Sequence, residues 1–499
     1  MGVVMGPILS FRGSDQVSWK LSALVITDGD PASFSMAASP GSAIEARLLW
    51  KNRNKGAFCY QFEAPMDNGP TSLTYTVDDQ TFQVAVPGKR ASPRMVYASC
   101  NGFSSPKLMK HVAEKNRMWS ILGNKHEANA YHLMLLGGDQ VYADPLWDSV
   151  RSIKTWNQLS TEEGDKAKFT TIMREQLENF YFELYTDRWA QPEVKYVMAR
   201  VPMLAMWDDH DIFDGWGSYD TKRQLSEVFQ GIRDVARKAF SVFQQQVGSG
   251  DAPRMGAIAP LYGFSFGYVV GKIAILALDM RNERSNDQVL SLDHWGEIYR
   301  WLDSLENLDH LLLMSSIPVV YPGFDTFERV LGIIPKHQDL EDDLRDHWNS
   351  RRHKGERIRL IHRLFSFAEN RNIRPTIISG DVHVAAVGVI ENSRLNSAGP
   401  PLVINQLISS AIVHPGPGQV FLFALNNVFD SSDEIDRGIV ARLMEFPGNT
   451  AKFVGNRNFL SLEPDASRRI WANWFAEGEE NDPYTKVIHA LEPTSSTGS

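Results

Sequence analysis

The chain has 499 residues, 43% of them hydrophobic and 22% charged, a composition typical of a globular protein with a large core. Its net charge of −9 argues against a general nucleic-acid binder, which needs a basic surface. Two cysteines, Cys59 and Cys100, do not indicate a disulfide framework. No apolar run is long enough to cross a membrane, and the N-terminus lacks signal-peptide and twin-arginine patterns, so we expect a cytoplasmic protein.

Residues 1–92 have the pattern of antiparallel strands. Apolar residues alternate with others in two stretches, which predicts half-buried strands, and a turn at residues 78–80 predicts a hairpin. The residues that carry the pattern are Phe58, Tyr60, Phe62, Leu73, Tyr75, Val77, Phe82, Val84 and Val86. "VPGKRASPR" (86–94) follows and is typical of a linker. We therefore predict a small N-terminal β-sandwich domain over residues 1–92.

From about residue 94, short apolar runs alternate with helical patterns. Residues 225–243 and 361–368 keep the i, i+3, i+4 spacing of amphipathic helices. Strands that alternate with helices predict a layered α/β domain.

Chemically active side chains follow several of the predicted strands. In α/β sheets, sites form beyond the carboxyl ends of strands. One aspartate there is often a turn or capping residue, but repeated Asp, His, Cys and Tyr are typical of a metal cluster that promotes displacement at phosphorus. These residues are Cys100, Asn101, Asp139, Tyr142, Asp208, Asp209, His210, Asp211, Asp279, Arg281, Asp381 and His383.

Four motifs in order resemble a known family. "ASCN", "GGDQVYAD", "WDDHDIFD" and "SGDVHVAAVG" are similar to motifs of the PhoD-like alkaline phosphatases and phosphodiesterases, in the calcineurin-like metallophosphoesterase superfamily. "ALDMRNERS" (277–285) also resembles a family segment. The resemblance implies a double β-sheet sandwich flanked by helices. We predict this catalytic domain over residues 93–425, and a C-terminal segment over 426–499 that packs on it and ends in a disordered tail, 494–499.

The resemblance also implies a role for each matching residue. Asp139 would bridge two metal ions, and His210 would be the general acid. For Asp208 three roles stay open: a metal ligand, a side chain that orients the neighbouring ligands, and a cap at the end of the strand. Cys100, Tyr142 and His383 would hold the first ion, and Asp209 and Asp381 the second, while Asn101, Arg281 and Arg284 would contact the substrate. For Arg281 and Arg284, a surface ion pair is the alternative.

The expected cofactor is a binuclear or larger metal centre. Phenolate, thiolate and imidazole at the first site suit Fe³⁺. Ser316 stands where the superfamily normally has a histidine, so the second site is rich in oxygen and favours Ca²⁺. The resemblance also implies iron with calcium, and Zn²⁺ or Mn²⁺ remain alternatives.

The predicted activity is hydrolysis of small phosphate monoesters or diesters, by attack of a metal-activated hydroxide with His210 as the acid. Arg281 would stabilise the developing charge. Two alternatives stay open: a catalytically inactive metal-binding protein, and an adaptor that uses the N-terminal β-domain. Asp144, Asp211 and Asp214 are interpreted as loop acids, with a site for an extra cation as the alternative. His347 is interpreted as part of an amphipathic helix face, with a position in the pocket as the alternative. The sequence does not indicate an oligomeric state.

Overall fold

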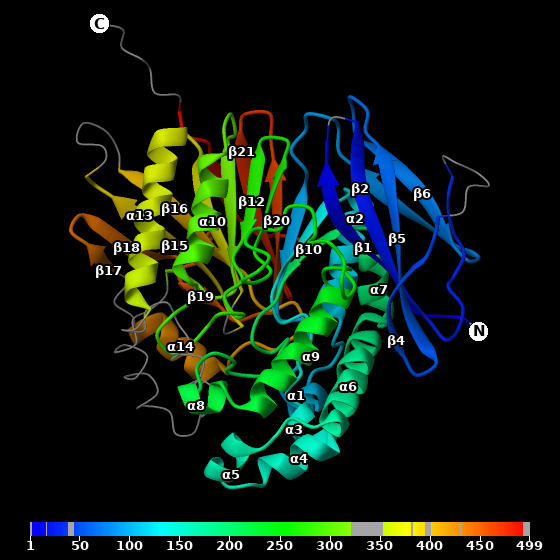
Figure 1. Cartoon of the computed structure of the whole chain (residues 1–499). Helices are drawn as coiled ribbons and strands as arrows, with labels where there is room; N and C mark the ends of the chain where they lie inside the picture. The colour runs from blue at the N-terminus through cyan, green and yellow to red at the C-terminus, as the bar shows by residue number, and fades with distance from the viewer. Residues whose placement is uncertain are drawn as a thin grey trace, which may run out of the picture. The chain divides into compact units, whose positions relative to one another are not determined.

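The protein is described by a computed structural model, which covers residues 2–15, 17–37, 44–320, 353–380, 383–394, 401–428 and 432–492. The chain forms two compact units (Figure 1). Unit 1 comprises Met1–Val96, Cys100–Ala257 and Ile412–His414. Unit 2 comprises Tyr97–Ser99, Ile258–Ala411 and Pro415–Ser499.

The main sheet of unit 1 combines N-terminal and later strands. Its order is β8 (Met95–Ala98), β9 (Leu133–Gly137), β10 (Met203–Met206), β1 (Val3–Ser14), β2 (Ser18–Thr27), β5 (Lys55–Pro65) and β4 (Arg47–Asn52). β1 pairs in parallel with β10, where Ser10 lies opposite Met203, and antiparallel with β2. The N-terminal strands thus share a sheet with β9 and β10, which differs from the separate domain predicted over residues 1–92. The pairing joins segments far apart in sequence, and local periodicity does not reveal it.

A second, small sheet in unit 1 holds the predicted hairpin. Its strands are β3 (Phe34–Met36), β6 (Thr71–Val77) and β7 (Gln80–Val86). Val77 pairs with Gln80 across the turn, which confirms the hairpin. Tyr75 lies between Phe34 and Phe82, with ring centroids 5.4 Å away on each side. These buried rings form the core between the small sheet and β5.

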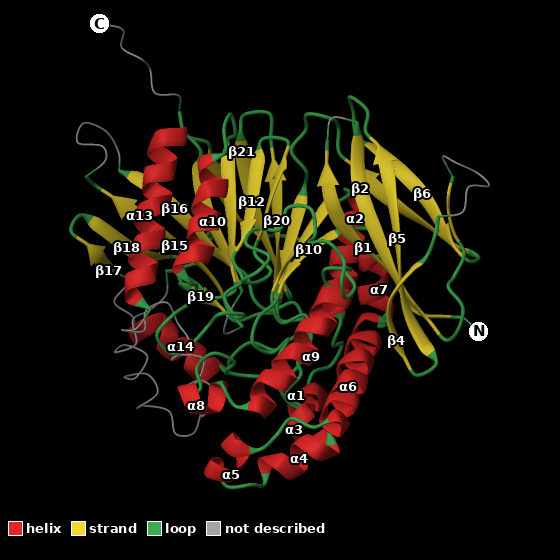
Figure 2. Cartoon of the chain, in the orientation of Figure 1, coloured by secondary structure: helices red, strands yellow, loops and turns green. Residues whose placement is uncertain are grey.

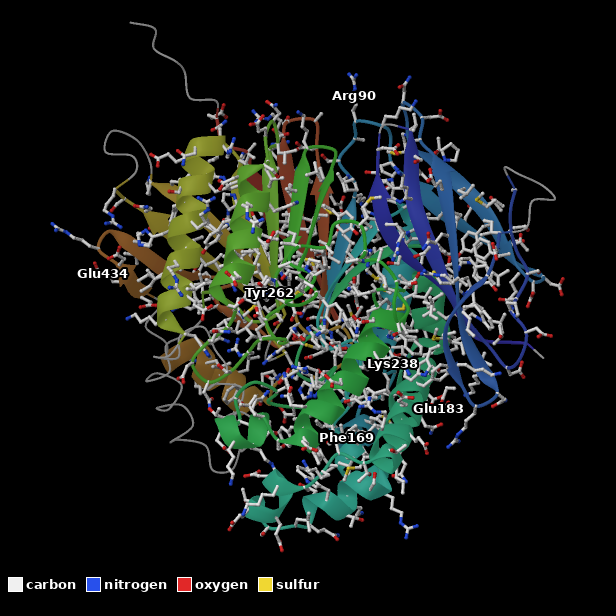
Figure 3. All side chains as sticks on the ribbon, in the orientation of Figure 1. Arg90, Phe169, Glu183, Lys238, Tyr262 and Glu434 are labelled. Atoms are coloured by element: carbon white, nitrogen blue, oxygen red, sulfur yellow. The ribbon has the colours of Figure 1, made fainter. Side chains whose placement is uncertain are left out.

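Helices follow β8, β9 and β10 in unit 1 (Figure 2). The two longest, α6 (Thr171–Trp189) and α9 (Glu227–Phe243), pack against each other, and Lys238 binds Glu178 at 3.0 Å. In Figure 3, Glu183 marks α6 and Lys238 marks α9. The others are α1 (Pro106–His111), α2 (Arg117–Ala128), α3 (Leu146–Ser149), α4 (Arg151–Asn157), α5 (Thr161–Lys166), α7 (Pro192–Met198) and α8 (Thr221–Gln224).

Unit 2 contains a second large sheet, with parallel strands in its middle. Its order is β11 (Phe266–Val270), β12 (Ile273–Ala277), β13 (His310–Ser315), β14 (Arg374–Ser379), β16 (Leu402–Ile408), β15 (Ala385–Asn392), β18 (Ile439–Met444) and β17 (Ser432–Asp436), and β19 (Phe453–Val454) pairs with β15. The helices α10 (Leu292–Asp303) and α13 (Lys354–Arg371) contribute to one buried apolar core with these strands, and α14 (Gln419–Val428) contacts β19.

The C-terminal residues of unit 2 form an antiparallel meander. β20 (Asn458–Pro464) pairs with β21 (Arg469–Ala476), which pairs with β22 (Tyr484–His489). The predicted tail, 494–499, lies outside the described residues.

Candidate metal centre

The centre is built where β9 and β10 end. Both strands are completely buried, and they run in parallel with Gly137 opposite Met206. Parallel strands end at the same edge, so the residues that follow them become neighbours. Gly138 has a φ of 97°, and a Cβ there would lie 2.7 Å from the Cβ of Asp208. Glycine therefore allows the two loops to approach each other.

Asp139, Asp209 and His210 meet at this edge. Each offers one ligand atom, and these atoms lie within 4.8 Å of one another. All three residues are buried, and Asp139 has the unusual φ of 52°. Among the described residues, Asp139 Oδ1 has no hydrogen-bond partner. Burial raises the pKa of Asp139 well above its ordinary value, and Asp208 and Asp209 add to this rise although His210 opposes it.

A thiol and a phenol adjoin this cluster. Cys100 Sγ lies 3.5 Å from Asp139 Oδ2, and the backbone N–H of Asn101 donates to the carbonyl of Asp139 at 2.8 Å. Tyr142 is buried, and burial raises the pKa of its hydroxyl well above the ordinary value, with a further contribution from Cys100. The loop after β8 therefore adds its sulfur to the carboxylate that follows β9.

His210 is held by an aspartate that the sequence did not distinguish. Its Nδ1 lies 2.8 Å from Asp144 Oδ2, while Asp144 Oδ1 accepts the backbone N–H of Asp214 at 2.8 Å. Burial alone would lower the pKa of His210. The carboxylates of Asp144, Asp139 and Asp209 outweigh it and raise that pKa well above its ordinary value. The arrangement favours a protonated imidazole that can donate a proton.

Asp211 links the loop after β9 to the loop after β10 through hydrogen bonds. Its Oδ2 accepts the backbone N–H groups of Asp139, at 3.0 Å, and of Asp208, at 2.9 Å. Its Oδ1 accepts the side-chain amide of Gln244 at 2.9 Å. Burial is the largest of the influences on its pKa, which is raised to about 7. Asp211 is fully buried and fixes the ends of β9 and β10 relative to each other, a role that its interpretation as a loop acid missed.

Tyr142 lies between two histidine rings. The His210 centroid is 4.3 Å from that of Tyr142, and the His414 centroid is 5.7 Å away with ring planes 22° apart. His414 Nε2 is also 3.2 Å from Ser104 Oγ. Sequence reasoning missed His414, although it follows the run "PLVINQLISS" and the strand-end rule could have indicated it.

Asn101 has structural contacts that the sequence did not predict. Arg188 donates to its carbonyl oxygen at 2.7 Å, and Trp119 Nε1 donates to its Oδ1 at 2.8 Å. Asn101 is completely buried. Burial lowers the pKa of Arg188 to about 10. These bonds fix the loop that carries Cys100, and contact between Asn101 and a substrate stays a prediction.

The remaining predicted residues lie elsewhere in the chain. Asp208 is buried beside Asp211 in unit 1, as described above. Arg281 and Arg284 belong to unit 2 and are buried, so neither is part of a surface ion pair. His383, also in unit 2, is half-buried with a φ of 62°. Asp381 and His347 lie outside the described residues, and the site roles of Asp381, His383, Arg281 and Arg284 stay predictions.

The donor set fits a metal ion. Asp139 and Asp209 are two buried carboxylates that share a single protonatable neighbour, His210, and Asp139 Oδ1 has no hydrogen-bond partner among the described residues, so a further positive charge would stabilise them. A thiol and a phenol whose pKa is raised by burial add donors that a ferric ion would deprotonate. Asp139, Cys100 and Tyr142 can therefore contribute to the site of such an ion, and Asp209 can contribute to that of a second ion.

Comparison with known proteins identifies the family. A model described as "PhoD related phosphatase" matches residues 66–338 and 332–432. The chain belongs to the PhoD related phosphatase family. A protein of Saccharomyces cerevisiae described as "Uncharacterized protein YGR266W" is 28% identical over 472 residues, which cover 78% of this chain and 66% of that protein. The chain thus spans just under two thirds of the length of this relative.

Solved structures share the fold. "Structure of PhoD" matches with a TM-score of 0.58 and 14% identity, over 97% of this chain and 88% of that one. The purple acid phosphatase PPD1 from yellow lupin (Lupinus luteus) seeds matches with a TM-score of 0.51 and 12% identity, over 99% and 77%. The predicted family and its α/β fold with antiparallel N-terminal strands are confirmed. In the described part of the chain, no helix combines the length and hydropathy that a membrane span requires.

Proposed function

We propose that this protein hydrolyses phosphoric esters with the help of metal ions held at the ends of β9 and β10. The observation that carries the proposal is the convergence of Asp139, Asp209 and His210 within 4.8 Å, in a member of the PhoD related phosphatase family. Asp139, Asp209, Cys100 and Tyr142 are the proposed ligands. Bound metal ions would supply Lewis-acid chemistry, polarising a phosphoryl oxygen and making water a stronger acid.

The protein's own residues would position and protonate the reacting groups. His210 is the proposed general acid, which gives its proton to the leaving oxygen of the ester. Asp144 accepts a hydrogen bond from Nδ1 of the protonated ring, 2.8 Å away, so the proton on Nε2 is the one available for transfer. Asp211 holds the two loops in the arrangement that this transfer needs. We favour Fe³⁺ with Ca²⁺ as the metals, on the donor types alone.

The test begins with metal content. Elemental analysis of the purified chain should find bound metal, and a panel of phosphate monoesters and diesters should reveal which class is hydrolysed. Prolonged chelation should abolish activity, and re-addition of the metals found should restore it. Bound metal without turnover of any ester would favour the inactive metal-binding alternative, and a chain that binds no metal would contradict the proposal.

A further inference from the structure

The ring of Tyr142 is closely packed, and one of its neighbours in unit 1 is His414. The two ring centroids are 5.7 Å apart with ring planes 22° apart, and both residues are buried. An edge of the Tyr142 ring faces Gly102, where an added Cβ would lie 2.4 Å from Tyr142 Cδ2. The His210 ring also approaches it, with centroids 4.3 Å apart. These neighbours together restrict the plane that the Tyr142 ring can adopt.

His414 is fixed through its backbone and through its side chain. Its backbone N–H and that of Val413 both donate to the carbonyl of Cys100, at 3.3 Å each. Its Nε2 lies 3.2 Å from Ser104 Oγ. His414 thus contacts two proposed metal ligands, Cys100 through the backbone and Tyr142 through the ring.

The plane of the Tyr142 ring matters because of where its hydroxyl lies. Burial raises the pKa of this hydroxyl, and the neighbouring Cys100 and Asp139 raise it further. A phenolate donates electrons to a ferric ion largely from the oxygen orbital perpendicular to its ring, so the ring plane influences how strongly the two interact. Groups that orient a metal ligand therefore tune the properties of the ion.

We propose that His414 is a positioning residue of the metal centre, which holds the ring plane of Tyr142 beside Cys100. This inference rests on the proposed function, because it takes Tyr142 as a metal ligand. The imidazole acts here as a flat surface against the phenol ring, and the Ser104 hydroxyl fixes its orientation.

The first test uses the metal-free full chain, so it does not depend on which metals bind. The protein is labelled with 3-fluorotyrosine, and Tyr142→Phe identifies the fluorine NMR signal of Tyr142 among those of 14 tyrosines. His414→Ala should shift this signal, because the neighbouring ring and its restraint are lost. An unchanged signal would overturn the proposal even if the chain proved to bind no metal and the proposed function failed.

The second test uses the metal-loaded chain. His414→Ala should shift the visible charge-transfer band and weaken metal binding by roughly 2- to 13-fold in chelator competition, the factor expected for one aromatic pair. His414→Phe keeps a ring and should restore most of the affinity, and Ser104→Ala should shift the band less than His414→Ala. An unshifted band in His414→Ala would overturn the proposal. A folded His414→Phe chain that has lost its metal would also overturn it, because the imidazole would then be a ligand.

A matched control is a second histidine–tyrosine pair in unit 1. The rings of His126 and Tyr131 have centroids 6.4 Å apart and planes 21° apart. His126→Ala should lower the free energy of unfolding without changing the Tyr142 signal or the visible band. If it shifts them as much as His414→Ala does, the effect comes from general loss of packing and the proposal is wrong.

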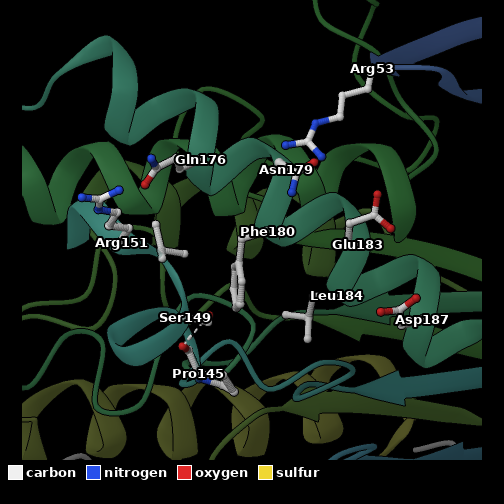
Figure 4. Close-up of a pocket in the computed structure, with 11 residues that line it drawn as sticks. Arg53, Pro145, Ser149, Arg151, Gln176, Asn179, Phe180, Glu183, Leu184 and Asp187 are labelled. Carbon is white, nitrogen blue, oxygen red and sulfur yellow. Dashed lines mark hydrogen bonds between the residues drawn. The ribbon is translucent and has the colours of Figure 1, made fainter. Parts of the chain in front are cut away.

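A milder control removes an aromatic ring from α6. Phe180 lies 5.4 Å from Tyr181, centroid to centroid, and lines a pocket of about 540 Å³ (Figure 4). None of the residues that line this pocket is a proposed ligand. Phe180→Ala should therefore leave the Tyr142 signal and the band in place, and a shift equal to that of His414→Ala would contradict a specific role for His414.

Discussion

His210 Nδ1 and Asp144 Oδ2 lie 2.8 Å apart, and this pair determines which nitrogen of His210 can serve the reaction. The aspartate holds the proton on Nδ1, so Nε2 is the atom left for a leaving group or a metal ion. The two alternatives, acid and ligand, predict different behaviour when His210 is removed.

If His210 is the general acid, His210→Ala should retain its metals and lose turnover mainly on esters with poor leaving groups. General acid catalysis is worth about 10²–10⁴-fold, so the loss should be of that order for an alkyl ester. An aryl ester with a stable phenolate should lose much less. Rates are compared at equal metal content, measured by elemental analysis. Equal losses on both esters, or loss of metal, would show that His210 is not the acid.

Asp144→Asn should also lose more turnover on the alkyl ester than on the aryl ester, but by a smaller factor than His210→Ala. The introduced amide can still contact Nδ1 of His210 but no longer stabilises the charged ring. Asp148→Asn is the matched control, since the side chain of Asp148 is 90% exposed. The control should match the unmodified chain on both esters. An Asp144→Asn chain with unaltered rates would contradict a role for the pair.

Tyr142 gives the metal centre an optical test. A phenolate or thiolate bound to ferric iron produces visible charge-transfer absorption, so the purified chain should be coloured. Tyr142→Phe should remove or shift this band, whereas Tyr181→Phe, a buried tyrosine that is not a proposed ligand, should keep it. Asp139→Asn should lose both metal and activity. A colourless, fully active protein without iron would contradict the Fe³⁺ assignment and favour Zn²⁺ or Mn²⁺.

Asp211→Asn should weaken metal binding although Asp211 is not itself a proposed ligand. The introduced NH₂ group would face either the N–H donors of Asp139 and Asp208 or the amide of Gln244. Loss of such supporting bonds typically costs about 10–100-fold in metal affinity, and the free energy of unfolding should fall by about 1–3 kcal/mol. Chelator competition measures the affinity.

A remote variant of similar stability is needed for comparison. Thr170→Ala removes the N-cap of α6, where the Thr170 side chain accepts the N–H of Met173, and should cost about 0.5–2 kcal/mol. This variant should retain the metal affinity of the unmodified chain. If Asp211→Asn and Thr170→Ala lose metal affinity equally, the effect of Asp211→Asn would come from the lower stability of the whole fold and not from the metal centre.

One buried histidine, His126, and one half-buried histidine, His132, should make the stability of the chain fall in mild acid. His126 and His132 each accept a backbone N–H through Nδ1, from Tyr131 and Arg94 respectively, so both are neutral in the fold. Burial lowers the pKa of each from 6.5 to about 4. The unfolded chain therefore binds more protons in that range, and stability is complete above pH 6.5 and declines as the pH falls toward 4.

Each histidine should contribute up to about 3 kcal/mol to this decline. His126→Asn and His132→Asn keep an acceptor near the Nδ1 position but do not titrate. Urea unfolding between pH 7 and 4.5 should show a shallower pH dependence in these variants. His111→Asn, at an exposed position, should not alter it. A slope that is the same in all variants would contradict the prediction.

Local sequence patterns were sufficient to predict part of the metal centre. Alternating strands and helices placed Asp139 and Asp209 at strand ends, and parallel pairing of β9 and β10 then brings them together. Asp144 and Asp211 were missed because their roles depend on partners 66 and 72 residues away in the chain, His210 and Asp139 respectively. No spacing rule for motifs covers such separations. The sharing of one sheet by β1 and β10 was missed for the same reason.

The pairing of β1 with β10 has a consequence for work with fragments. A recombinant catalytic piece that begins near residue 93, where the sequence alone suggests a boundary, would lack β1. One side of β10 would then present unpaired backbone N–H and C=O groups, on a strand whose residues are all buried in the complete chain. Such an edge recruits strands from other molecules. By pairing with β10, β1 protects this edge from association with other molecules, so any shortened version of the protein should retain β1.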